Sequence, residues 1–419
     1  MRSPWAWVPS LYFAEGLPYV VAMTVSVILY KRLGVDNAEI ALATSWLYLP
    51  WVVKPLWSPI VDVLRTRRQW VIGTQIAIGA SMVAVAVAIP SKMFFPLTIG
   101  CFALMAIASA THDIAADGFY MLGLGEGQQA SFIGLRTTFY RLAMIAGQGG
   151  LVYFAGHLEK RMSVPGAWSI AFGLLAATFF ALTVWHSLAM PRPALDVEAH
   201  SSSPRDVLLR FFDVFAEFFK KPGIVRIVAF LLVYRFAEAQ LVKLISPFLL
   251  DARAKGGLGL ATDQVGVAYG TVGLVSVTLG GLLGGVAISR GGLKQWLWPM
   301  VCAIHLPDLA FVFLSQVQPQ NLFVINAAIA LEQFGYGFGF TAYSLFMIMI
   351  SSGPYKTAHF AICTGFMALG MMLPGMFSGY LQEWLGYRGF FVWVILSTVP
   401  GFLVAALVRI DPAFGRKAT

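Results

Sequence analysis

The sequence contains few charged residues. Only 12% of its 419 residues are Asp, Glu, Lys or Arg, whereas soluble domains contain about 25%. Because 58% of the residues are hydrophobic, a water-soluble chain of this size would have more apolar surface than one or two cores can bury. The composition excludes a disordered chain, a secreted disulfide scaffold and a DNA-binding domain. It predicts a polytopic membrane protein.

Cysteine is also scarce. Cys101, Cys302 and Cys363 lie in apolar stretches without CxxC spacing, so we expect packing residues rather than a metal or redox site. The sequence shows no metal-ligand set, P-loop or nucleophile elbow, and we expect no cofactor and no metal. The first apolar run is too long for a signal peptide and no cleavage site follows it, so no cleavable signal peptide is expected.

Twelve apolar runs are long enough to cross a bilayer, which takes about 20 helical residues. They lie at about 5–30, 39–58, 70–90, 95–121, 130–155, 166–189, 224–250, 263–288, 296–316, 321–350, 358–380 and 388–409. Apolar residues recur at helical spacing from Arg205 to Lys221, which predicts an amphipathic interfacial helix. We therefore expect an N-terminal six-helix bundle at 1–189, a cytoplasmic linker at 190–223 and a C-terminal six-helix bundle at 224–419.

The basic residues predict the orientation in the membrane. With the N-terminus inside, the cytoplasmic segments contain fifteen Lys and Arg residues and the opposite loops contain eight. The positive-inside rule then places both termini in the cytoplasm. It also accounts for the net charge of +9 without a nucleic-acid partner.

A weak internal repeat relates the two halves. The tripeptide FAE occurs at 13–15 and again at 236–238, and similar tripeptides open the runs at 130–132 and 358–360. Parallel half-repeats joined by a linker are the architecture of major facilitator transporters, whose substrate binds near the membrane midplane between the halves. Basic loops that correspond in the two halves supply candidates for a cytoplasmic gate, together with Lys54. These loop residues are Asp62, Arg65, Arg67 and Arg290.

Ionisable residues inside the apolar runs are costly, so they usually face a cavity or one another. Asp113 and Asp117 are four residues apart and lie about 40° apart on one helical face. Two carboxylates that close repel each other, so one is expected to take up a proton, or the pair binds a cation. Alternatively, arginines of the run at 130–155 hold both. Glu15, beside Gly16 and Pro18, faces either a cavity or the membrane surface.

Two sets of candidate residues follow from these positions. The proton-coupling candidates are Glu15, Asp113, Asp117, Glu238 and Glu332. The substrate-binding candidates are Tyr12, Tyr19, His112, Arg136, Tyr140, Arg141, Arg235, Gln333 and Tyr336. We expect Lys54 to extend toward the cytoplasmic side and Arg235 to pair with Glu238 three residues on. Arginines bind carboxylates and aromatic faces suit sugar rings, so the pattern predicts an ion-coupled symporter for a polar, anionic solute.

Several motifs resemble those of the AmpG muropeptide permeases. The segment KPLWSP at 54–59, followed by Asp62, is similar to their K-F-L-W-S-P…D, and HDIAAD at 112–117 is similar to Q-D-I-x-x-D. The segments YRLAM at 140–144 and YRFAE at 234–238 are similar to Y-R-L-G-M and Y-K-L-G-D. The resemblance spans about residues 10–410. It implies a major facilitator fold and functional roles for Lys54, Asp113, Asp117, Arg141, Glu238 and Glu332.

The resemblance further implies a bacterial inner-membrane protein that imports anhydromuropeptides with protons for cell-wall recycling, and a monomer is expected. The wider group also contains acetyl-coenzyme A transporters, so another amino-sugar, oligosaccharide or acyl-coenzyme A solute is an alternative. His112 replaces the usual Gln of the motif and Glu238 replaces an Asp. A membrane acyltransferase is a distant alternative, because His112 and Asp117 match H-x-x-x-x-D, but a helix places them about 140° apart.

Overall fold

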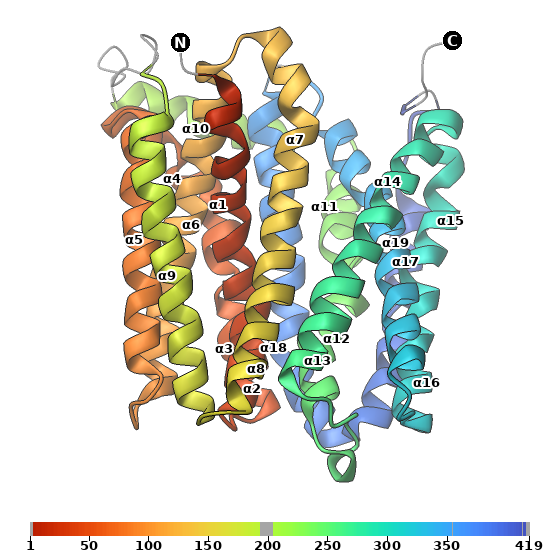
Figure 1. The fold of residues 1–419 in the computed structure, drawn as a ribbon. Coiled ribbons are helices and arrows are strands. Elements are labelled where there is room, and N and C mark those ends of the chain that lie inside the picture. The colour runs from red at the N-terminus through yellow and green to blue at the C-terminus, as the bar shows by residue number, and fades with distance from the viewer. Residues whose placement is uncertain (1–2, 193–203, 354, 413, 416–419) are drawn as a thin grey trace.

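The computed structural model describes residues 3–192, 204–353, 355–412 and 414–415. Every regular element in this part of the chain is a helix, and the helices run roughly parallel to one long direction (Figure 1). The two ends of the chain lie at the same end of the molecule (Figure 1). We call the opposite end, where α2, α8 and α12 finish and α13 begins, the distal end.

The first half of the chain contains nine α-helices in the described residues. They are α1 (Val8–Val20), α2 (Ser26–Arg32), α3 (Asn37–Trp46), α4 (Leu49–Leu64), α5 (Arg67–Ala88), α6 (Phe94–Gly123), α7 (Glu126–Met144), α8 (Val152–Glu159) and α9 (Val164–Ala189). A 3-10 turn, η1 (Pro4–Ala6), precedes them, and π-helical turns join α1 to α2 and α7 to α8: η2 (Val21–Val25) and η3 (Ile145–Leu151).

The helix α10 (Pro204–Phe219) occupies the segment for which the sequence predicts an interfacial helix, and it contacts both α4 and α18. The remaining α-helices are α11 (Ile224–Val233), α12 (Phe236–Leu250), α13 (Thr262–Val267), α14 (Leu274–Gly291), α15 (Leu293–His305), α16 (Leu309–Val317), α17 (Leu322–Ile350), α18 (Lys356–Leu396) and α19 (Val399–Leu407). The short turns between them are η4 (Arg253–Lys255), η5 (Ala268–Gly273) and η6 (Leu306–Asp308).

The helices confirm the prediction of an all-α membrane protein with twelve spans. Eight described helical stretches are long and apolar enough to cross a membrane. One of these, Ala358–Leu407, is 50 residues long and turns back at Gly386, whose φ of 64° is a left-handed conformation that favours glycine. It therefore supplies two spans. The stretches 37–64, 126–159 and 224–250, which are more polar or more broken, supply the other three.

Each half of the chain packs mainly against itself. Helix α5 lies against α6 and α9, and α1 lies against α7; later in the chain, α17 lies against α14 and α15. Figure 1 shows these as two neighbouring groups of helices. The groups meet where α18 packs on α3 and α13 packs on α8.

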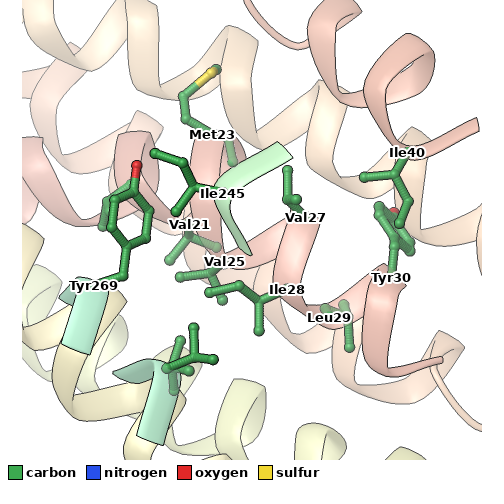
Figure 2. Packing of buried hydrophobic residues seen from close by; sticks show 14 of the residues in the cluster. Val21, Met23, Val25, Val27, Ile28, Leu29, Tyr30, Ile40, Ile245 and Tyr269 are labelled. Atoms are coloured by element: carbon green, nitrogen blue, oxygen red, sulfur yellow. The ribbon is translucent and has the colours of Figure 1, made fainter. Parts of the chain in front are cut away.

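Buried apolar side chains join the two groups. Val21 and Ile28 of the first span belong to the same buried cluster as Ile245 of α12 and Tyr269 of η5, and Figure 2 shows these residues close together. Large apolar side chains are also exposed on the outside of the molecule, for example Leu104 at 63%. A bilayer would cover these outward-facing side chains, which a soluble protein could not leave in water.

Candidate functional site

A cavity of about 520 Å³ lies between the two halves of the chain. Its wall contains side chains from α1, α4, α6 and α7 on one side and from α12, η5 and α17 on the other. Most of the predicted site residues line it. These are Tyr12, Glu15, Tyr19, Asp113, Arg136, Tyr140, Arg141, Arg235, Glu238, Gln333 and Tyr336.

The other predicted residues lie elsewhere. His112 is fully buried behind the wall, with its Nε2 3.0 Å from Nε2 of Gln75. Asp117 and Glu332 lie next to the cavity wall through their contacts with Tyr12 and Gln333. Among the gate candidates, Arg65 and Arg290 are exposed and Arg67 packs against Gly118, whereas the side chain of Asp62 lies outside the described residues.

Asp113 is held by the helix that carries the KPLWSP motif. Its Oδ2 accepts a hydrogen bond from Trp51 Nε1 at 3.0 Å and lies 3.3 Å from Lys54 Nζ. The ammonium group of Lys54, which is expected from the sequence to extend toward the cytoplasmic side, turns to this carboxylate of α6. The Trp51 ring also meets the Tyr19 ring edge-on, with 5.2 Å between the ring centres. The group therefore combines one ion pair with two aromatic surfaces.

Asp117 is paired with an arginine of α7. Arg136 Nη2 lies 2.7 Å from Asp117 Oδ1, and the Tyr12 hydroxyl donates to the same oxygen at 3.2 Å. The guanidinium also lies over the Tyr12 ring, 4.5 Å from its centre. Asp113 and Asp117, one turn apart on α6, therefore each have their own cation. The alternative that arginines of the run at 130–155 hold both carboxylates therefore fits Asp117 alone, because the cation beside Asp113 is Lys54 of α4.

Arg235 does not pair with Glu238, so that expectation is wrong. The chain leaves helical geometry between α11 and α12, and Arg235 has φ −105° and ψ 22°. The i, i+3 neighbourhood of a regular helix is therefore lost. The guanidinium donates instead to the Tyr336 hydroxyl at 2.6 Å, and it lies 5.0 Å from the centre of the Phe340 ring. These contacts hold the guanidinium against the aromatic wall of the cavity.

Lys243 of α12 is a buried lysine that is not among the site residues predicted from the sequence. Its Nζ donates to Thr44 Oγ1 of α3 at 2.9 Å and lies 5.1 Å from the centre of the Tyr48 ring. It thus joins the two halves of the chain across the middle of the molecule. Its partners come from a distant span, and the sequence gives no signal that would identify them.

Polar contacts also tie the two halves together at the distal end. Lys31 Nζ lies 2.8 Å from Asp251 Oδ1, and Lys160 pairs with Asp263. The Thr262 hydroxyl donates to Glu159 Oε2 at 2.7 Å, which adds a hydrogen bond between α13 and α8. The ends of the first, fifth, seventh and eighth spans are therefore fastened across the interface.

The backbones approach closely at the same place. A Cβ atom on Gly156 of α8 would lie 2.2 Å from the backbone nitrogen of Asp263. Only glycine permits this approach without a shift of one helix. The distal end is thus closed by both backbone packing and ion pairs.

Comparison with solved structures identifies the fold. The nucleoside transporter NupG superposes with a TM-score of 0.68 over 96% of this chain and 98% of that chain, at 16% identity. A bacterial homologue of the human lysosomal transporter Spinster, in an inward-facing conformation, gives 0.71 over 95% and 94%, at 14% identity. The chain is therefore a multi-pass membrane protein with the major facilitator fold, which is built from two six-helix bundles.

Sequence comparison identifies the family. Residues 14–226 match the BT1 family, and the chain belongs to it. The Escherichia coli K12 protein named anhydromuropeptide permease is 24% identical over 406 residues, which cover 95% of this chain and 78% of that protein. The predicted likeness to AmpG permeases is confirmed. Because its relatives are transporters, the chain is classed as a transporter and not as an enzyme.

Proposed function

We propose that the chain is a proton-coupled symporter that imports anhydromuropeptides across the inner membrane for cell-wall recycling. These solutes join N-acetylglucosamine, 1,6-anhydro-N-acetylmuramic acid and a peptide. The observation that carries the proposal is that Arg141, Arg235, Asp113 and a set of aromatic rings meet in one cavity. The name of the Escherichia coli relative supports this solute class.

The cavity has the chemistry that such a solute needs. Its volume of about 520 Å³ falls within the range of about 300–1,000 Å³ that is usual for small-molecule sites. Tyr19 and Trp51 offer apolar ring faces to the sugars, while Arg141 and Arg235 offer guanidinium groups to the carboxylates of the peptide. The two halves of the chain contribute different groups to the cavity wall. Most of the aromatic rings and carboxylates come from the first half, and Arg235 comes from the second.

The two ion pairs on α6 give protons a way to act on this cavity. A proton on Asp117 removes the charge that holds Arg136, and a proton on Asp113 does the same for Lys54. The freed cations can then bind an anionic solute. Titratable groups of this kind, without an ATP site, suit coupling to an ion gradient.

The proposed orientation assigns the distal contacts a role. With both termini in the cytoplasm, Lys31–Asp251 and Lys160–Asp263 lie on the outer side and close it. Alternating access requires that they separate when the solute enters from outside. The described conformation corresponds in this account to the state that releases solute inward.

Uptake by whole cells tests the proposal. Cells that lack their own permease would carry this chain and receive labelled N-acetylglucosaminyl-1,6-anhydro-N-acetylmuramyl tripeptide, with and without a protonophore. We expect uptake that collapses when the protonophore is added. If the protein is verified in the membrane and no uptake occurs, the proposed solute is wrong. Uptake that stays the same when the protonophore is added contradicts proton coupling.

A further inference from the structure

Three acidic side chains from distant parts of the sequence meet in the second half of the chain. Glu238 of α12, Asp308 of η6 and Glu332 of α17 each place a carboxylate oxygen within 4.8 Å of the other two. Their exposed fractions are 0%, 1% and 1%. Glu238 and Glu332 are both among the proton-coupling candidates predicted from the sequence, whereas Asp308 is not among the predicted site residues. The three residues, called the acidic triad below, form one group.

The oxygens of the acidic triad lack donors. Both oxygens of Glu238, both of Asp308 and Oε1 of Glu332 are buried without a hydrogen-bond partner among the described residues. Oε2 of Glu332 accepts from Gln333 Nε2 at 2.9 Å. Buried charged carboxylates are normally paired or bound to a metal, because an unpaired buried charge strongly destabilises the folded state. The lack of donors is an observation independent of the close spacing of the three residues. It indicates that a positively charged ligand binds to these oxygens.

Breaks in two helices converge on the acidic triad. Pro307 lies in the 3-10 turn that separates α15 from α16, and Asp308 ends that turn. Glu238 stands in the first turn of α12, directly after the break at Arg235. Broken helices at membrane depth are the usual setting of cation sites in secondary transporters, because their free backbone groups can complete the coordination. Glu238 is also among the residues that line the central cavity, so the acidic triad lies beside that cavity.

We propose that the acidic triad binds a hard metal cation of the size of Na⁺ or Ca²⁺. Oxygen ligands suit these ions, and Ca²⁺–oxygen distances of about 2.3–2.6 Å place ligands on opposite sides of the ion about 5 Å apart. A spread of at most 4.8 Å between the three oxygens leaves each of them within about 2.8 Å of one common point, so a small inward shift lets one ion contact all of them. The site goes beyond the proposed proton coupling, since it lies in the other half of the chain from Asp113 and Asp117.

Thermal unfolding of the purified full-length protein in detergent tests the site. NaCl and CaCl₂ would each be compared with choline chloride at matched ionic strength and without solute. We expect one of the two metal cations to raise the Tm in a saturable way, and Asp308→Asn and Glu332→Gln to lose that shift. Asp36→Asn, the same type of change at an exposed residue, should keep it. No shift with either cation, or the same shift in every variant, overturns the proposal.

Direct binding keeps the test decisive if a triad variant does not fold. Wild-type protein would be titrated with ²²Na⁺ and, separately, with ⁴⁵Ca²⁺. Saturable binding of about one ion per chain supports the site, and the label that binds identifies the ion. Absence of saturable binding of both labels overturns it. Neither measurement requires uptake, so its failure is distinguishable from failure of the proposed transport function.

Discussion

Arg136 and Asp117 form an ion pair within the membrane, with 2.7 Å between Nη2 and Oδ1, and the Tyr12 hydroxyl donates to the same oxygen. The pair joins α7 to α6 beside the cavity. Its side chains are 32% and 38% exposed, so water from the cavity can reach it. A proton that neutralises Asp117 would break this ion pair between the two helices. The proposed coupling depends on this change.

Asp117→Asn should abolish proton-driven uptake. The amide cannot take up and release the proton, whereas the partial exposure of the pair limits the cost in stability to about 1 kcal/mol or less. The measurement is uptake of labelled anhydromuropeptide per unit of protein in the membrane. Asp36→Asn, the same type of change at an exposed side chain, is the control. Full uptake by Asp117→Asn would exclude this pair from coupling.

Arg235→Lys should weaken solute binding. The lysine keeps the charge but lacks the planar guanidinium, whose central carbon lies 5.2 Å from the centre of the Tyr336 ring and 5.0 Å from that of the Phe340 ring. We expect the KM for uptake to rise about tenfold, which corresponds to about 1.4 kcal/mol. Arg226→Lys, at an exposed position of α11, serves as the matched control. An unchanged KM in Arg235→Lys would mean that the guanidinium of Arg235 does not contact the solute.

Gly156→Leu should open the distal end, because any side chain there would meet the backbone of Asp263. The readout is labelling of Thr24→Cys, which lines the cavity, by a membrane-impermeant maleimide added to intact cells. The native cysteines would first be replaced by serine. We expect labelling to increase and uptake to fall.

Gly150→Leu is the matched control for the distal end, because a Cβ atom on Gly150 meets nothing within 4 Å. It should behave like the parent protein in both assays. Equal labelling in the two leucine variants would show that the contact at Gly156 does not close the distal end.

His112→Gln should leave uptake close to the wild-type level. His112 lies behind the cavity wall, and a glutamine can keep a hydrogen bond to Gln75. The measurement is uptake of labelled anhydromuropeptide per unit of protein in the membrane. Loss of uptake at a normal protein level would mean that His112 contributes to transport despite its position.

The sequence predicted the helices and the cavity-facing residues well for physical reasons. Twelve apolar runs are visible because a bilayer imposes a fixed length on each span. Asp113 and Asp117 share a face because they are one turn apart on a continuous helix, α6. Most other candidates also reached the cavity wall, since a charged side chain inside a span has few other places to go.

The sequence could not predict which side chains of different spans pair, or how breaks in the helices change these pairings. The partner of Lys54, Asp113, lies 59 residues away. Arg235 misses Glu238 because the helix is interrupted at that residue. Asp308 gives no signal by itself, and only the three-dimensional packing brings it to Glu238 and Glu332. These relationships depend on tertiary structure, which spacing along one helix does not contain.

The most direct test of the account is solute accumulation in proteoliposomes that contain only this protein. Labelled anhydromuropeptide would be supplied outside, with an imposed pH gradient that is acidic outside, with no gradient, and with the gradient plus a protonophore. The account predicts accumulation above the outside concentration only when the gradient is present and intact. Accumulation that is the same in all three conditions, or absent from all three, would contradict it.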